Sequence, residues 1–209
     1  ALSAEQFGWT LAGGGHPALA LFAGAGLLLA ASLARQRSLL LLAAVSISAS
    51  FGLTGHTAGL EEPGLAPWVV AGHLMIAGFW IAAPVTLWPG AAMTDANILA
   101  RTEAFSRIAR FAVPVLFVSG IYLFWRINGS FATPLSSGYG QLLAAKLLAA
   151  TLAVGLGAIN MTIIARKLAT EPAKGRSALR ATLRVDAILF AAILIFIAAA
   201  TTISGPVSY

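Results

Sequence analysis

The sequence predicts an all-α membrane protein, a bundle of six transmembrane helices with both chain termini on the outer side. Hydrophobic residues make up 59% of the 209 residues and charged residues only 10%, whereas soluble proteins carry about 25% charged residues. Six apolar stretches are long enough to cross a bilayer, which takes about 20 residues each. The basic residues are concentrated in alternate connections between these stretches. Together these observations indicate a polytopic protein embedded in the lipid bilayer.

The predicted spans follow one another along the chain. They are expected near residues 17–34, 38–56, 67–89, 108–127, 141–165 and 183–203. These stretches lack the polar face that a helix of a soluble protein presents to water. Residues 1–16 are expected to form a short outer segment ending in a Gly-rich turn, and Pro17 suits the first position of a helix. Without a repeat or a linker, residues 1–209 are expected to form a single transmembrane domain.

Charge placement predicts the orientation of the bundle. All but two of the 13 Lys and Arg residues lie between spans one and two, three and four, or five and six, or at the span ends next to these connections, and the exceptions are Arg126 and Lys146. Cytoplasmic connections carry an excess of basic residues, so these three connections are expected inside and both termini outside. The net charge of +6 is therefore a signal of orientation and does not indicate nucleic-acid binding.

Three histidines form the first candidate site. His16 precedes span one, His56 ends span two, and His73 lies about two turns inside span three. If consecutive spans are antiparallel, all three fall in the outer third of the bundle. Imidazole is the commonest metal-ligating side chain, and ionisable groups at membrane depth are functional candidates. We therefore expect His16, His56 and His73 to share one metal ion near the outer surface. The alternative is that they only form hydrogen bonds between helices.

Further polar residues could support this site or continue a path from it. The candidates for orienting the histidine rings are Ser50, Thr54, Thr57 and Tyr139, and those for a path are Ser48, Asn160, Met161 and Asp186. Lys146 is expected to be an outer counter-charge and Asp186 an inner polar anchor. Because they lie at opposite ends of the bundle, these two residues should not pair with each other.

The chemistry of the candidate ligands leaves three classes of function open. Imidazole suits Cu(II), zinc and haem iron, whereas Cu(I) prefers thiolate or thioether, and the chain has no Cys and three Met. A copper-binding protein is the first class. The second is a b-type cytochrome in which His56 and His73 ligate haem b. The third is an accessory subunit without a metal. With no P-loop, nucleotide motif or hydrolytic triad, we do not expect an enzyme unless haem supplies redox chemistry.

Several strings, in order, resemble one known family. These are TGHTAG at the end of span two, His73 followed by Trp80, RTEAFSRIARFAVPVLFVSGIYLFW, YGQLLAAKLLAATLAVGLGAIN, an acidic residue early in the last span, and Pro206. The resemblance is to the copper resistance protein D family and covers roughly residues 38–206. The chain departs from the family pattern where FWIAAPV lacks the usual glycines and where Asp186 replaces the usual glutamate.

The resemblance implies a function and a location. Members of this family are integral proteins of the bacterial inner membrane, linked to copper uptake or handling beside a periplasmic copper-binding protein. For this chain it implies copper as the cargo, received at the outer histidine site and passed across the membrane.

Overall fold

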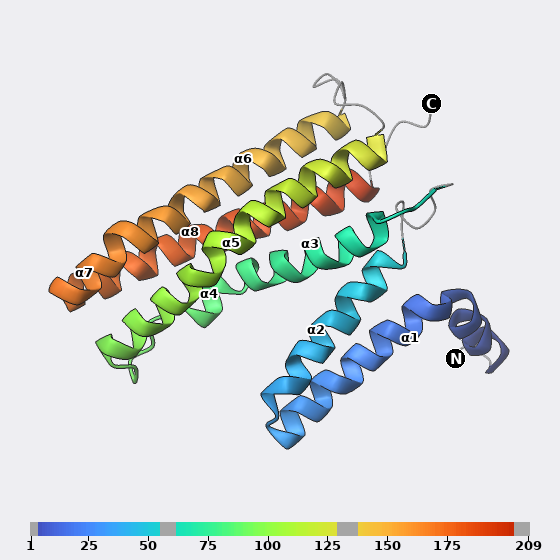
Figure 1. Cartoon of the computed structure of the whole chain (residues 1–209), viewed down its shortest axis with the longest axis horizontal. Coiled ribbons are helices and arrows are strands. Elements are labelled where there is room, and N and C mark those ends of the chain that lie inside the picture. The colour runs from blue at the N-terminus through green and yellow to red at the C-terminus, as the bar shows by residue number, and fades with distance from the viewer. Residues whose placement is uncertain (1–3, 55–61, 129–137, 203–209) are drawn as a thin grey trace. The chain divides into compact units, whose positions relative to one another are not determined.

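The structure, a computed structural model, describes residues 4–54, 62–128 and 138–202. Every regular element within these ranges is a helix (Figure 1), which confirms the all-α class. In chain order the elements are α1 (Ala4–Ala34), α2 (Arg37–Gly52), α3 (Ala66–Ile81), α4 (Ala83–Thr86), α5 (Asp95–Asn128), α6 (Gly138–Ile159), the π-helix η1 (Asn160–Ile164), α7 (Ala165–Thr170) and α8 (Pro172–Thr202).

The lengths of the helices fit a multi-pass membrane protein. In the described part of the chain, 5 helical segments are long and apolar enough to span a bilayer, and they are Gly15–Ala34, Ala66–Thr86, Asp95–Arg126, Gly140–Thr170 and Pro172–Ala199. The second predicted span corresponds to α2, which has 16 residues. At 1.5 Å per residue α2 is about 24 Å long, shorter than the roughly 30 Å hydrocarbon core. The count of six spans and the outer position of both termini therefore stay predictions.

Two helices are longer than the predicted spans, and both extend into the basic connections. The fourth span was expected to begin near residue 108, but α5 begins at Asp95, and α8 begins at Pro172 instead of near residue 183. The hydroxyl of Thr94 accepts a hydrogen bond from the backbone N–H of Asn97, with 3.3 Å between Oγ1 and N, and so caps α5. Pro172 suits the first position of a helix because its missing N–H is not needed there. Most basic residues of these connections therefore lie on helices.

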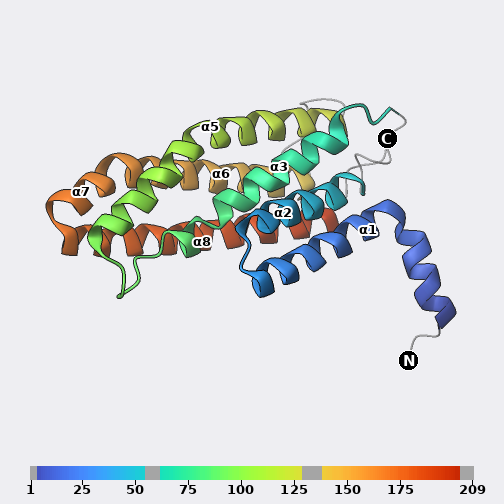
Figure 2. The ribbon, with the colours of Figure 1, turned by 60° about the horizontal axis from the view of Figure 1, so that its bottom comes forward.

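Glycine and proline break the helices at two points. Gly15 has φ 48° and ψ −143°, which interrupts α1 in the expected Gly-rich turn, and the residues before it are helical. Figure 2 shows α1 bent toward its N-terminal end. The third span was expected as one helix over 67–89, but α3 ends at Ile81 and the short α4 begins at Ala83. Pro84 explains this break, because it lacks the N–H that would bond to the carbonyl four residues earlier.

The contacts divide the chain into two compact units. Unit 1 comprises Ala1–Ala77 and Leu116–Gly129, and unit 2 comprises Gly78–Val115 and Ser130–Tyr209. Both α3 and α5 contribute residues to each unit. The expectation of a single transmembrane domain stays a prediction, and each unit is described by itself.

In unit 1, α1 and α2 lie side by side in Figure 1 and in Figure 2. Ser46 Oγ on α2 donates a hydrogen bond to the carbonyl of Ala20 on α1 at 2.8 Å. A Cβ on Gly24 would lie only 2.5 Å from Ile47 Cγ1 and 3.1 Å from the Ile47 nitrogen. The absent side chain thus lets the two helices approach closely, as small residues do between helices in membranes.

Unit 2 has a core of larger side chains. The buried cluster contains Ala83, Leu87, Ile98, Ile164, Leu168, Leu179 and Leu183. Trp80 packs edge-on against Phe190 with ring centroids 5.3 Å apart. Leu179 and Leu183, spaced by one helical turn, face this core from the basic first half of α8. The basic extension of α8 is therefore an amphipathic helix that helps to form the core.

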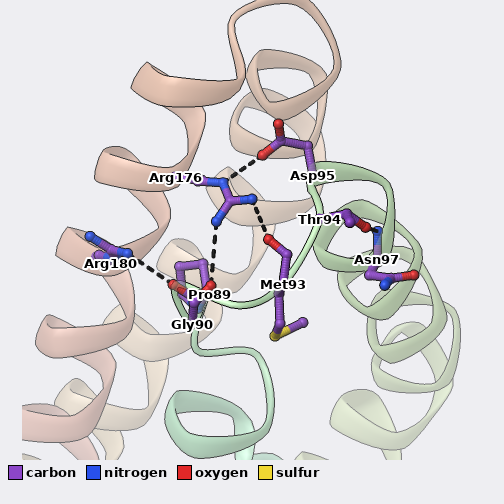
Figure 3. Close-up of polar contacts among 8 residues, drawn as sticks. All are labelled: Pro89, Gly90, Met93, Thr94, Asp95, Asn97, Arg176 and Arg180. Carbon is purple, nitrogen blue, oxygen red and sulfur yellow. Dashed lines mark hydrogen bonds and ion pairs between the residues drawn. The ribbon is translucent and has the colours of Figure 1, made fainter.

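Two arginines of α8 hold the connection between α4 and α5 (Figure 3). Arg176 donates to Asp95 Oδ1 at 2.5 Å, and its two other guanidinium nitrogens donate to the carbonyls of Gly90 and Met93. Arg180 donates to the carbonyl of Pro89 at 3.0 Å. These bonds satisfy carbonyl groups of the non-helical connection.

Candidate functional site

His73 lies on α3 in unit 1, half-buried against α5. Its Nδ1 is 2.9 Å from Ser119 Oγ, and that hydroxyl donates to the carbonyl of Leu116 at 2.9 Å. A serine hydroxyl has one proton to give, so when Ser119 donates to Leu116 it accepts from His73. In that arrangement the neutral ring carries its proton on Nδ1.

The residue after Ser119 makes room for the same ring. A Cβ on Gly120 would lie 3.4 Å from His73 Cε1, at the short end of ordinary van der Waals contact. Ser119 thus contacts the imidazole directly, and Gly120 lies beside the same ring. Sequence reasoning placed this Ser-Gly pair in a family motif but did not connect it with His73, because Ser119 is 46 residues away along the chain.

The other two predicted ligands are placed differently. His16 is exposed on α1, directly after the break at Gly15, and His56 lies outside the described residues. Among the residues that are described, no group of three or more His, Asp or Glu is arranged to hold a metal ion. A shared site of His16, His56 and His73 therefore stays a prediction.

The predicted partners of the histidine rings bond instead to their own helix. Ser50 Oγ donates to the carbonyl of Ile47 at 2.6 Å, and Thr54 Oγ1 lies 3.2 Å from the carbonyls of Ser50 and Phe51. Such bonds are the usual way in which helical Ser and Thr satisfy their hydroxyls. Ser48 is buried on the same helix. Thr57 and the side chain of Tyr139 lie outside the described part.

Unit 2 contains a cavity of about 250 Å³. Its wall is formed by residues of α3, α4, α5, α6, η1 and α8 and is mostly apolar. The lining side chains that carry nitrogen, oxygen or sulfur beyond Trp80 are Thr102, Ser106, Arg110, Asn160, Met161 and Asp186. The fold thus brings together three of the residues predicted for a path, namely Asn160, Met161 and Asp186.

Asp186 is the most unusual of these side chains. It is 5% exposed, and within the described residues its buried Oδ1 has no hydrogen-bond partner. Asn160 is 7% exposed, and its Oδ1 accepts a hydrogen bond from Thr182 Oγ1 at 2.6 Å. Asn160 also begins the π-helix η1, and π-helical turns inserted in α-helices occur frequently at functional sites. The cavity therefore combines a fixed amide with a carboxylate oxygen that lacks a donor.

The charged residues expected at opposite ends do not pair. In the described part of the chain the ion pairs are Lys174 with Glu171 and Arg176 with Asp95. Lys146, half-buried on α6, and Asp186 form no ion pair with each other in this part of the chain, and their roles as counter-charge and anchor stay predictions.

Sequence reasoning missed three lining residues of α5, Thr102, Ser106 and Arg110. It could have found them through their helical spacing of four, which continues the pattern of the span toward Asp95.

Comparison with known proteins gives one match. No curated protein matches the chain, and no solved structure does. The family model described as copper resistance protein D matches residues 99–200. This region contains Ser119 and the six polar or sulfur-bearing residues of the cavity, while His16, His56 and His73 precede it. The match over residues 99–200 supports the resemblance to the copper resistance protein D family that the sequence motifs indicated.

Proposed function

We propose that this protein is a copper-handling membrane protein that binds copper at a histidine site centred on His73 and aids copper uptake. The family match supports copper as the metal, and the apolar helices support a membrane location. The observation that carries the proposal is the orientation of His73 by Ser119. The family match gives no support to the haem alternative.

An oriented neutral imidazole is a suitable copper ligand. Metal-ligating histidines usually donate their other ring N–H to a fixed acceptor, which sets the tautomer and the direction of the ring. Ser119 provides that acceptor when the ring carries its proton on Nδ1. Imidazole suits Cu(II), and the chain has no thiolate to offer. We propose that His16 and His56 supply the remaining imidazoles.

The proposed site faces the outer, periplasmic side of the bacterial inner membrane. This orientation follows from the positive-inside rule, because most basic residues lie in the N-terminal parts of α5 and α8, on α7 or around the start of α2. A periplasmic copper-binding protein would be the partner that delivers the metal. The handling of copper is then a binding and transfer function, and we do not propose an enzyme activity.

Copper titration of the purified full chain tests the proposal. Wild-type protein in detergent should bind Cu(II) and give an electron paramagnetic resonance spectrum with nitrogen ligands. His73→Ala should abolish this signal. Ser119→Ala should weaken binding by about 10–100-fold, which is typical for loss of a residue that orients a ligand, and Ser119→Thr should restore most of it. Ser177→Ala, on an exposed part of α8, is the matched serine control and should change nothing.

Two results would overturn the proposal. One is unchanged Cu(II) affinity in His73→Ala, and the other is purified protein with a Soret absorption band, which would indicate haem. The same titration on membrane vesicles tests on which side of the membrane the site lies. Right-side-out vesicles should bind Cu(II) at this site without permeabilisation, and inverted vesicles should require it.

A further inference from the structure

We infer that the cavity of unit 2 binds the headgroup of a zwitterionic phospholipid with a primary ammonium, phosphatidylethanolamine, whose phosphate meets Arg110 and whose ammonium meets Asp186. This lipid site is independent of the copper site proposed above. The charges of the cavity, the place where it opens and its size all favour such an occupant.

Two opposite charges line the cavity without pairing. The lining contains one guanidinium, that of Arg110, and one carboxylate, that of Asp186. Neither takes part in an ion pair within the described part of the chain. Asp186 is 5% exposed, and its buried Oδ1 has no hydrogen-bond partner there. A buried carboxylate is costly without a donor, so a ligand that meets both groups has to bring a donor for Asp186 and an acceptor for Arg110.

The headgroup of phosphatidylethanolamine carries both of these groups. Arginine binds phosphate through charge-assisted and often bidentate hydrogen bonds, and Ser106, one helical turn before Arg110, adds a hydroxyl to the same wall. A primary ammonium has three N–H donors to offer to Asp186. The headgroup has no net charge, and neither does the pair of lining side chains. Its binding therefore leaves no buried charge uncompensated, whereas a cation or a phosphate alone would leave one.

The cavity opens between α5 on one side and α6 with η1 on the other. Four of its lining residues are exposed, and they are Arg110, Pro114, Ala158 and Met161. All four lie in segments that are long and apolar enough to span the bilayer. The neighbouring side chains of Phe111 and Val115 on α5 are 70% and 53% exposed. A ligand can thus enter from the bilayer and lay its acyl chains along apolar side chains.

The depth and the size of the cavity fit a headgroup. Arg110 lies near the start of the expected span 108–127, and Asp186 near the start of the expected span 183–203. By the predicted topology both starts are at the inner surface, where basic pockets between spanning helices bind lipid headgroups. The volume of about 250 Å³ is below the roughly 300–1,000 Å³ of pockets that enclose a whole ligand of drug size. The cavity therefore admits a headgroup while the acyl chains stay outside.

Lipid titration of the delipidated full chain in detergent, followed by native mass spectrometry, tests the inference. The probes are phosphatidylethanolamine, phosphatidylcholine and phosphatidylglycerol with the same acyl chains. Phosphatidylethanolamine should bind about 10-fold more tightly than phosphatidylcholine, whose quaternary ammonium has no N–H for Asp186, because a hydrogen bond between charged groups contributes about that factor. Phosphatidylglycerol lacks the ammonium and has a net negative charge, so it should bind no better than phosphatidylcholine.

Variants of the two charged residues should have different effects. Asp186→Asn should remove the preference for ethanolamine over choline. Arg110→Gln should weaken the binding of both lipids by about 10-fold, because both carry the phosphate. Arg107→Gln removes an exposed arginine of α5 outside the cavity lining. It is the matched control and should bind all three lipids as wild type does.

Filling the cavity gives a test that leaves its charges in place. Gly157 lines the cavity, and a Cβ there would have no described atom within 4 Å, so Gly157→Leu should fold and occupy the site. A Cβ on Gly155 also meets open space, but Gly155 is not a lining residue, and Gly155→Leu is the control. Gly157→Leu should lose the preference for phosphatidylethanolamine, and Gly155→Leu should keep it. If Asp186→Asn does not fold, as judged by circular dichroism, this pair decides the question.

Three results would overturn the inference. The first is equal affinity of the wild type for phosphatidylethanolamine and phosphatidylcholine, and the second is an unchanged preference in Gly157→Leu. The third is equal competition by soluble glycerophosphoethanolamine, which has no acyl chains and would identify a free solute as the ligand. Copper binding is a separate readout, since Asp186→Asn and Gly157→Leu should keep the Cu(II) signal that depends on His73.

Discussion

Unit 1 and unit 2 bury different kinds of residue. Apart from Leu116, the buried residues described in unit 1 are small, and they are Gly24, Ala31, Ala43, Ser48, Ser50, Gly52 and Ala66. The buried residues of unit 2 include Trp80, Leu168, Leu179, Leu183 and Phe190, all at 7% exposure or less. Unit 1 is thus held by close approach of helix backbones, and unit 2 by interlocking side chains.

The difference teaches where each candidate site can form. Between helices that approach closely there is little free volume, so a site in unit 1 must use a side chain at the edge of the contact, as His73 does beside Gly120. Large side chains of unequal shape leave gaps, and the cavity of unit 2 is such a gap. Small residues suit packing in lipid, where there is no hydrophobic drive between helices. The larger core lies on amphipathic extensions whose other face is basic.

Truncation of the unit 2 core should have the largest effect on stability. Leu179 is 0% exposed in the central cluster, so Leu179→Ala removes buried contacts and leaves a void. We expect it to lower the free energy of unfolding by about 2–5 kcal/mol, measured by denaturation in detergent micelles. Leu194→Ala on the same helix is the control, because Leu194 is 51% exposed, and it should change stability by less than about 1 kcal/mol. Equal losses would contradict the view that unit 2 depends on its core.

The fold class was predictable from composition, but the helix ends in unit 2 were not. Basic residues lower the mean hydropathy of residues 95–107 and 172–182, so spans defined by apolar length begin too late at their N-terminal ends. The amphipathic spacing was nevertheless present, since Leu179 and Leu183 are one turn apart and Ile98 and Thr102 likewise. A criterion based on periodicity would have found these extensions.

The candidate sites were predictable only in part. His73, Asn160, Met161 and Asp186 are conspicuous because they are polar or sulfur-bearing residues in apolar surroundings. Their partners are not, since Ser119 and Thr182 lie 46 and 22 residues away from the groups that they contact. Packing between the spans decides which helices face each other, and a local sequence pattern does not predict these contacts.

The close contact in unit 1 gives a prediction of intermediate size. Gly24→Ala would place a Cβ 2.5 Å from Ile47 Cγ1 and 3.2 Å from the carbonyl of Ala43, so α1 and α2 must separate. Overpacking of this kind costs about 1–3 kcal/mol. Gly26→Ala on the same helix has nothing within 4 Å and should stabilise the chain by about 0.5–1 kcal/mol, since alanine is the better helix former. In thermal melting in detergent, Gly24→Ala should lower the melting temperature and Gly26→Ala should raise it. Two shifts of the same sign would exclude close backbone approach as the basis of the stability of unit 1.

The smallest expected effect compares one arginine from each unit. Arg176 in unit 2 is 22% exposed and bonds to Asp95 and to two carbonyls, whereas Arg126 in unit 1 makes an exposed bond to the carbonyl of Glu62. A lysine keeps the charge but loses the planar fork that reaches several acceptors at once. Arg176→Lys should therefore cost about 1–2 kcal/mol, the range for lost hydrogen bonds of a charged group, and Arg126→Lys less than about 0.5 kcal/mol. Chemical denaturation of both variants in the same micelles measures the difference. A larger loss for Arg126→Lys would mean that the exposed connection of unit 1, and not only its helix contact, holds that unit together.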